Sequence, residues 1–293
     1  MITIKICPLC KSEDRQPFDR RTFRGREVTN QLCRTCGLVY QSPRPSDSEL
    51  EDFYRQEYRL LYQGTADPGR KDLVIQHGRA ESLLHYLKDK THPPRRHLDI
   101  GASAGVLVMR IQDHFHCQSE GVEPGEAYRY YAERQGLHMH DSLETARANL
   151  KQRFDLVTMA HVLEHLPDPV GYLRTIREHM LEPAGRLLVE VPNLYGHDCF
   201  EVAHLAGYSV HTLRQVLAKS GFQVLDVSIH GQPRSVVLPL YITLLARPQK
   251  NSEAAEQSPV RRERAVRLKR RIGLSQRRFF ERLFPGLAWL PTP

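Results

Sequence analysis

The stretch RHLDIGASAGVLVMRI, residues 96–111, joins an apolar run, a loop of small residues and a second apolar run. Residues 98–100 have the composition of a short buried strand, and the run after Gly105 has that of a helix. The loop between them, GASAG, fits two kinds of site. It matches G-x-S-x-G, the turn that presents a nucleophilic serine in hydrolases. It also matches, with one glycine missing, the loop after a first strand that holds a nucleotide-like cofactor.

The residues around this loop favour the cofactor site. A nucleophilic serine of this type needs an oxyanion-hole loop on an earlier strand. The chain before Arg96 instead carries a cysteine-bearing segment and helical patterns. We therefore interpret Ser103 as a small residue of a cofactor loop, and we assign the chemistry to other residues.

Short apolar runs alternate with helical patterns after Arg96. The runs lie at 98–100, 121–123, 154–160 and 186–191, and the helical patterns at 105–115, 125–136, 168–181 and 210–220. This alternation predicts an α/β fold with a Rossmann-like, doubly wound and mostly parallel sheet. The last two runs, FQVLDVSI and SVVLPLYITLLA, follow each other without a helix, which predicts an antiparallel edge hairpin.

Two carboxylates flank the predicted cofactor loop. Asp99 ends the first strand and Glu123 follows the second, where a carboxylate can accept hydrogen bonds from both hydroxyls of a ribose. Ser103 stands where a dinucleotide fingerprint has its second glycine, so a pyrophosphate would lack its close approach to the backbone. S-adenosylmethionine has no phosphates, and it is the cofactor that we expect.

Several motifs resemble those of class I S-adenosylmethionine-dependent methyltransferases. They are LDIGASAG, GVEPGE, FDLVTMAHVLEHLPDP, GRLLVEVPN and LRQVLAKSGFQV. The chain is most similar to the group in which a four-cysteine zinc module precedes the catalytic domain, as in sugar C-methyltransferases and polysaccharide-cluster methyltransferases. The resemblance covers residues 5 to 247.

The resemblance implies roles for residues along the predicted sheet edge. Asp99, Gly101 and Gly105 would line the methionine end of the cofactor, with Ser103 in place of the usual glycine. Glu123 would hold the ribose, and Asp141 would lie near the adenine. Ala160 and His161 would border the methyl-transfer site.

Four cysteines form two C-x-x-C pairs, Cys7–Cys10 and Cys33–Cys36, separated by 22 residues. Two such knuckles supply four sulfur ligands in tetrahedral geometry, which suits Zn²⁺. Four protein ligands leave no open position, so we predict a structural zinc in a zinc-ribbon-like module. Cys117 and Cys199 are expected to be ordinary buried thiols.

His204 is the candidate general base. Sugar C-methyltransferases carry a Glu-His pair in this region, and here the pair reads Ala203-His204, so C-methylation loses one of its usual residues. A structural role for His204 is the alternative. Tyr54 and Tyr58 could cover the site from the preceding helix, or could simply pack there.

HVLEH, residues 161–165, fits the H-x-x-E-H motif of zinc peptidases. That motif needs a continuous helix, whereas here a strand runs in and Pro167 and Pro169 follow. We predict a loop on the cofactor side that carries Asp168 as a helix cap, with no metal shared by the two histidines.

The basic charge is concentrated at the C-terminal end. Residues 249–293 hold 11 lysines and arginines against 4 acidic residues, which is +7 of the net +8 of the chain. Within SQRRFFERLF, Phe279, Phe280, Leu283 and Phe284 are predicted on one helix face and arginines on the other. Such a segment, 260–290, could contact an anionic membrane, an acidic partner or nucleic acid, pack on its own domain, or remain solvated.

The predicted organisation has four parts. They are a zinc-binding module (1–42), a helical linker or cap (43–94), an S-adenosylmethionine-binding methyltransferase domain (95–248) and a basic amphipathic tail (249–293). The chain has no apolar segment of signal-peptide or membrane-span length, so we expect a cytoplasmic protein, with peripheral contact at the inner face of the membrane as an option.

The function that we predict is methyl transfer from S-adenosylmethionine to a small-molecule or glycan acceptor, with a sugar as the favoured class. RNA methylation through the zinc module, its arginines and the basic tail is one alternative. We favour a nucleic-acid partner less than a small-molecule or glycan acceptor. A catalytically inactive adaptor that keeps the fold is the other alternative.

Overall fold

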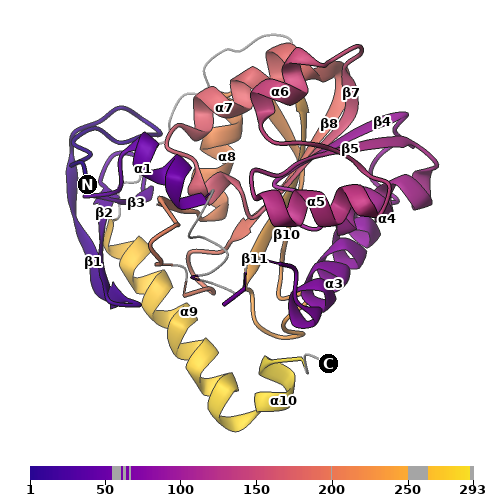
Figure 1. Cartoon of the computed structure of the whole chain (residues 1–293). Helices are drawn as coiled ribbons and strands as arrows, with labels where there is room; N and C mark the ends of the chain where they lie inside the picture. Colours follow the sequence, from indigo (N-terminus) through magenta and orange to yellow (C-terminus); the bar gives the residue numbers. More distant parts are fainter. Residues whose placement is uncertain (55–60, 62–63, 66, 199, 250–262, 291–293) are drawn as a thin grey trace.

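The computed structural model describes residues 1–54, 61, 64–65, 67–198, 200–249 and 263–290. Tyr58 and Cys199 lie outside the described residues. A central sheet with helices on both faces forms the main body, and a small sheet built mainly from N-terminal strands lies beside it (Figure 1). A long C-terminal helix starts next to the small sheet and runs along the lower side of the molecule.

The central sheet has seven strands, five of them parallel. In spatial order they are β10 (Phe222–His230), β11 (Tyr241–Pro248), β8 (Leu181–Pro192), β7 (Phe154–Ala160), β4 (Arg96–Ile100), β5 (Gln118–Val122) and β6 (His138–His140). β11 pairs antiparallel with both β8 and β10. The predicted doubly wound sheet with an antiparallel edge hairpin is therefore confirmed.

Alternate residues of the strands point to opposite faces, and each face is covered by helices. Leu156, Leu188 and Leu245 pack with one helix set, and Val157, Val189 and Leu244 pack with the other. The first set is α3 (Arg70–Leu87), α4 (Val106–Phe115) and α5 (Glu126–Arg134); the second is α6 (Leu143–Ala148), α7 (Pro169–Thr175), continued by a π-helical turn over Ile176–Met180, and α8 (Val210–Lys219).

The N-terminal sheet is built from β1 (Arg15–Phe23), β2 (Arg26–Cys33) and β3 (Val39–Gln41). Its fourth strand is β9 (Ala206–Gly207), which comes from the main body and pairs antiparallel with β3. Leu9, Leu38 and Tyr40 share one hydrophobic core with the sheet and with α8. The module is thus joined to the main body by both hydrogen bonds and apolar packing.

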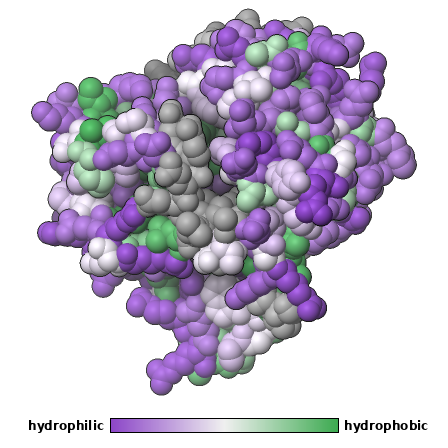
Figure 2. Space-filling model, viewed as in Figure 1, coloured by the Kyte–Doolittle hydropathy of each residue, from purple (hydrophilic) through white to green (hydrophobic). Residues whose placement is uncertain are grey.

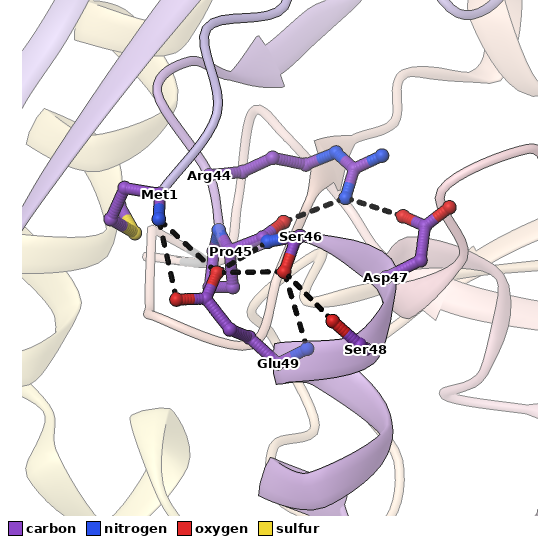
Figure 3. Close-up of polar contacts among 7 residues, drawn as sticks. All are labelled: Met1, Arg44, Pro45, Ser46, Asp47, Ser48 and Glu49. Carbon is purple, nitrogen blue, oxygen red and sulfur yellow. Dashed lines mark hydrogen bonds and ion pairs between the residues drawn. The ribbon is translucent and has the colours of Figure 1, made fainter.

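The predicted capping signals are present at three helix starts. Ser46 caps α1 (Asp47–Asp52) and receives the backbone N–H of Glu49, whose carboxylate accepts from the Ser46 N–H and from the amino group of Met1 (Figure 3). Asp168 and Ser209 accept backbone N–H bonds at the starts of α7 and α8. Each cap satisfies an amide that the first helical turn leaves without a partner.

Helix α9 (Glu263–Leu283) and the short α10 (Pro285–Ala288) form the C-terminal end of the described chain. Val266 is buried with Leu32 and Phe200, so α9 packs on the module and on the main body together. Among the described residues, none of the helices combines the length and the apolar character needed to cross a lipid bilayer.

Candidate active site

A cavity of about 1260 Å³ opens at the carboxyl ends of β4 to β8. The chain leaves β4 toward β5 and β6 and later returns to β7 on the other side of β4. Such a switch point is where open α/β sheets bind ligands. The volume exceeds the range of about 300–1,000 Å³ that is usual for one small ligand, so it can hold two reactants side by side.

The loop between β4 and α4 needs two glycines for steric reasons. Gly101 and Gly105 have φ of 74° and 77°, and a Cβ at either would come within 2.4 Å of Val162 or Leu137. Ser103, between them, also has a positive φ of 52° and lines the cavity. Its backbone N–H donates to Glu123 Oε2 at 2.9 Å. The loop therefore helps to position the Glu123 carboxylate, the group that the cofactor interpretation assigns to the ribose.

Glu123 follows β5 and is buried. Its Oε1 accepts the backbone N–H of Gly125 and its Oε2 that of Ser103, each at 2.9 Å. These two bonds fix the carboxylate at the cavity wall, and a carboxylate oxygen can accept more than one hydrogen bond.

Asp99 lies in β4 and is 3% exposed. The Thr158 hydroxyl donates to Asp99 Oδ1 at 2.6 Å, and His97 Nε2 lies 2.8 Å from that hydroxyl. Burial raises the pKa of Asp99 to about 7, and the nearby charge of Glu123 adds to the rise, although the Thr158 hydrogen bond opposes it. Asp99 therefore changes charge near neutral pH.

Most of the other predicted cofactor residues also line the cavity, whereas Gly105 is not among the lining residues. Asp141, after β6, and Ala160, which ends β7, both line it. His161 lines it as well, and its backbone takes a left-handed conformation with φ of 58°. The structure thus brings Asp99, Glu123, Asp141 and Ala160 to one cavity from four different strands.

His161 lies between two buried carboxylates. Its Nδ1 is 3.2 Å from Glu164 Oε1, and its Nε2 is 3.4 Å from Glu190 Oε1. Glu190 also has Arg79 Nε at 3.0 Å and accepts from the Thr243 hydroxyl at 3.0 Å. Because both ring nitrogens face carboxylates, His161 holds the loop after β7 in place against β8.

Glu190 remains ionised despite complete burial. Burial by itself raises the pKa of this carboxyl, but hydrogen bonds from His161 and His230 and the charge of Arg79 hold it well below its ordinary value. The bridge from Arg79 ties α3 to the sheet beside the cavity.

His204 also lines the cavity. Its ring lies 4.9 Å, centroid to centroid, from that of His165, and Glu164 acts on it electrostatically. Burial first raises the pKa of Glu164, but His161, His165 and His204 lower it to about 2, so the carboxylate is ionised. An ionised carboxylate therefore lies beside His204, the candidate general base.

His165 is held by two contacts through Nδ1. That nitrogen lies 2.9 Å from the carbonyl of Ala203 and 2.9 Å from the Tyr54 hydroxyl. The carbonyl can only accept, so Nδ1 carries the proton, and burial lowers the pKa of His165 to about 4, which keeps the ring neutral. Tyr54 lies at the cavity as predicted.

Glu164, His165 and His204 offer ligand atoms within 4.8 Å of one another, a set that could hold one divalent cation. His161 is not in this set, and HVLEH forms a strand end and a single 3₁₀ turn over Leu163–His165. The prediction that this segment is no continuous metal-binding helix is confirmed. The three-residue set itself was missed, because 40 residues separate Glu164 from His204 and no local spacing signals their contact.

The four cysteines of the N-terminal module form a compact cluster. Their sulfur atoms lie within 4.8 Å of one another, with Cys7–Cys36 at 3.6 Å and Cys10–Cys33 at 3.4 Å. Sulfur ligands 2.3 Å from a tetrahedral Zn²⁺ would lie about 3.8 Å apart. The two knuckles also match: the N–H of Lys11 donates to Cys7 O, and that of Gly37 to Cys33 O. The cluster therefore fits the ion.

A family model described as "Methyltransferase domain" matches residues 75–227, which is more than half of the chain. Two ubiquinone biosynthesis O-methyltransferases are similar in sequence. The one from Aeromonas salmonicida is 33% identical over 105 residues, 34% of this chain and 44% of that protein. The one from Proteus mirabilis is 27% identical over 118 residues, which cover 38% of this chain and 48% of that protein. The chain thus spans about half the length of these relatives.

Solved structures are similar in fold. The 1,6-didemethyltoxoflavin-N1-methyltransferase of Burkholderia thailandensis has a TM-score of 0.53 at 19% identity, over 80% of this chain and 99% of that one. The magnesium protoporphyrin IX methyltransferase of Synechocystis, with bound S-adenosylhomocysteine, has a TM-score of 0.50 at 14% identity. The match covers 70% of this chain and 100% of that one. At these identities the likeness concerns the fold.

Proposed function

The chain belongs to the methyltransferase-domain family, and from that premise we propose that it transfers a methyl group from S-adenosylmethionine to a hydroxyl of a small-molecule acceptor. The observation that carries this proposal is the cavity, which has a buried carboxylate pair at one wall and a histidine beside an ionised carboxylate at the other. The first wall suits the donor and the second suits the acceptor.

The donor wall has the groups that this cofactor needs. Asp99 offers an anionic oxygen to the ammonium group of the methionine part, and Glu123 can accept from the two ribose hydroxyls. Asp141 lies further along the cavity, where we propose that it contacts the adenine. Ala160 and His161 border the space between the walls, where the methyl group would pass.

The acceptor wall supplies a base. S-adenosylmethionine carries a methyl group on a positively charged sulfur, so the protein needs chiefly to align the acceptor and remove its proton. The acceptor oxygen forms a bond to the methyl carbon as the carbon–sulfur bond breaks, and the hydroxyl proton passes to His204. The charge of Glu164 stabilises the imidazolium that results.

A sugar hydroxyl is the acceptor class that we propose. Further polar side chains line the same cavity as His204; they are Tyr54, His165, His197, Glu201 and Arg234. Such a lining suits a polyhydroxyl ligand. A phenolic acceptor is the second candidate, because the similar ubiquinone biosynthesis enzymes are O-methyltransferases. Assays with labelled donor on nucleotide sugars and on catechols distinguish the two.

We also propose that the four cysteines hold a structural Zn²⁺. With all four positions taken by sulfur, the ion would have no open site for catalysis. RNA methylation is less well supported, because two arginines of the module already pair within the protein: Arg20 with Glu27 at 2.6 Å and Arg21 with Asp198 at 2.6 Å.

Replacing Glu123 by alanine is expected to weaken S-adenosylmethionine binding by roughly 10- to 150-fold, the effect of losing charge-assisted hydrogen bonds worth about 1.5–3 kcal/mol. Calorimetric titration measures the dissociation constant. Glu133→Ala, at an exposed carboxylate of α5 outside the cavity lining, is the matched control and should bind within about twofold of the parent. Unchanged binding by the Glu123 variant would contradict the assigned cofactor site, and no binding by the parent protein would favour the inactive adaptor.

The pKa of Asp99 predicts a pH dependence of the same binding. With a pKa of about 7, the carboxylate is mostly protonated at pH 5.5 and mostly ionised at pH 7.5. Affinity for S-adenosylmethionine should therefore rise by about tenfold from pH 5.5 to pH 7.5. The α-amino group of the ligand stays mostly protonated over this range, because its pKa is about 7.7–8.0. Titrations of the parent and of Asp99→Asn check it, since the variant should show a flat profile. A parent profile as flat as that of the variant would show that Asp99 does not bind the ammonium group.

A further inference from the structure

The outward face of α9 carries a continuous apolar stripe. Leu268, Ile272, Phe279 and Leu283 are each between 53% and 58% exposed. Their spacing of four, seven and four residues places them on one side of a helix. Phe284 and Leu287 are also exposed and extend the stripe to α10. In Figure 2, the lower end of the molecule, where α9 and α10 meet, shows hydrophilic residues with some hydrophobic ones at its edge.

The opposite face of α9 already accounts for the packing of the helix. Arg270 is 5% exposed, lies 3.2 Å from Asp198 and stacks 4.1 Å from the centre of the Phe200 ring. A Cβ on Gly273 would lie 1.9 Å from the carbonyl of Tyr195, so the helix backbone is in close contact there. Phe280, predicted with the apolar face, instead packs with Leu238 and Ala288. Folding thus leaves the outward stripe unexplained.

A row of arginines runs beside the stripe. Arg264, Arg271, Arg278 and Arg282 are exposed, and their spacing of seven, seven and four residues puts them on one flank of it. Between residues 264 and 283 the acidic residue is Glu281, which pairs with Arg277 at 2.8 Å. The outward face therefore combines apolar side chains with a row of positive charges. Within residues 264–283, no acidic residue pairs with this row.

We propose that this face lies on an anionic lipid membrane, with the apolar stripe at the acyl boundary and the arginine row on the headgroups. Apolar area and anionic attraction together provide interfacial binding. A second copy of the chain is a poorer occupant, because two-fold pairing of the stripes would bring the arginine rows together. The charge of the flank calls for an anionic partner, and a lipid surface also accommodates the apolar stripe.

This placement would set the cavity beside the membrane. The backbone N–H of Leu290 donates to Arg234 O at 2.8 Å, and α10 packs on Tyr241; both Arg234 and Tyr241 line the cavity. An acceptor with a lipid-linked end could then enter from the bilayer. This consequence rests on the proposed methyl transfer, whereas membrane binding itself does not.

Sedimentation with vesicles tests the proposal on the full chain. Vesicles of phosphatidylcholine with about 30% phosphatidylglycerol, which gives them a negative surface charge, are compared with vesicles of phosphatidylcholine alone. The parent should bind the anionic vesicles at least about tenfold more tightly, and added salt should weaken the binding. A Leu268→Ser/Ile272→Ser/Phe279→Ser variant and an Arg271→Gln/Arg278→Gln/Arg282→Gln variant should each lose about tenfold or more.

The matched control is Tyr130→Ser/Leu225→Ser, which replaces exposed apolar side chains on α5 and β10 and should bind as the parent does. Circular dichroism and thermal unfolding show that each variant folds. Equal binding by the stripe variant and the parent, or no binding by the parent, would overturn the proposal. A parent that elutes as a dimer, with a monomeric stripe variant, would assign the face to self-association. Calorimetry with S-adenosylmethionine reports separately on the proposed activity.

Discussion

Replacing His204 by alanine is expected to lower kcat by about 10²- to 10⁴-fold, the range for losing a positioned general base. The dissociation constant of S-adenosylmethionine should stay within about twofold of the parent, because the donor wall is formed by other strands. His204 is the cavity histidine next to both Glu164 and His165, so its loss removes the proton acceptor and leaves the carboxylate in place.

Single-turnover assays with labelled donor measure this effect, and imidazole added to the buffer should restore part of the rate. The matched control is His85→Ala, an exposed histidine of α3 outside the cavity lining, which should retain the parent rate. A His204 variant with full activity would assign the histidine a structural role. A variant that loses cofactor binding together with rate would show that the two walls are not independent.

Replacing Cys33 by serine is expected to release the proposed zinc and to lower the Tm by roughly 10 °C or more. A structural zinc contributes its binding free energy to folding, and each 1 kcal/mol shifts the Tm of a domain of this size by about 2–4 °C. Cys33 is buried with Cys7, Leu9 and Leu38 in the core shared by the module and the main sheet, so the loss should reach beyond the module.

The same substitution should lower kcat more than cofactor affinity. The N–H of Gln41 donates to Leu205 O at 2.8 Å, and β3 pairs with β9, directly after His204. A loosened module would therefore free the segment that holds the base. Metal analysis and thermal unfolding test the first part, with Cys117→Ala, a buried cysteine outside the quartet, as the control. Full zinc content or an unchanged Tm in the Cys33 variant would contradict the proposed zinc site.

Local sequence patterns were sufficient to predict the main sheet and the donor wall. Strand periodicity, the glycines of the GASAG loop and the carboxylates after successive strands are all local signals, and parallel strands bring their carboxyl ends to one edge. Asp99 and Glu123 are therefore predicted to meet at the cavity without any knowledge of distant contacts, whereas Asp141 and Ala160 were indicated by the resemblance to methyltransferases. Helix caps at Ser46, Asp168 and Ser209 follow from short-range spacing in the same way.

The acceptor wall could not be predicted in this way. Glu164 and His204 come from loops that follow different strands, and Arg79 reaches Glu190 from a helix 111 positions earlier in the chain. Side-chain contacts of this kind depend on how loops and helices pack over the sheet, and no periodicity records that packing. The inward turn of Arg270 and Phe280 in α9 is another case, because an amphipathic pattern does not tell which face packs on the protein.

The sequence by itself determined the α/β fold, the order of strands and helices along the chain, and the cysteine quartet, since each rests on spacing along one stretch of chain. It also indicated candidate cofactor residues, in part through the resemblance to methyltransferases. Only the tertiary structure decided which histidine lies beside a buried carboxylate, that the cysteine module pairs with the main body through β9, and which face of α9 remains exposed. These features depend on contacts between residues far apart in sequence, whose free energies are determined by packing and burial in the folded chain.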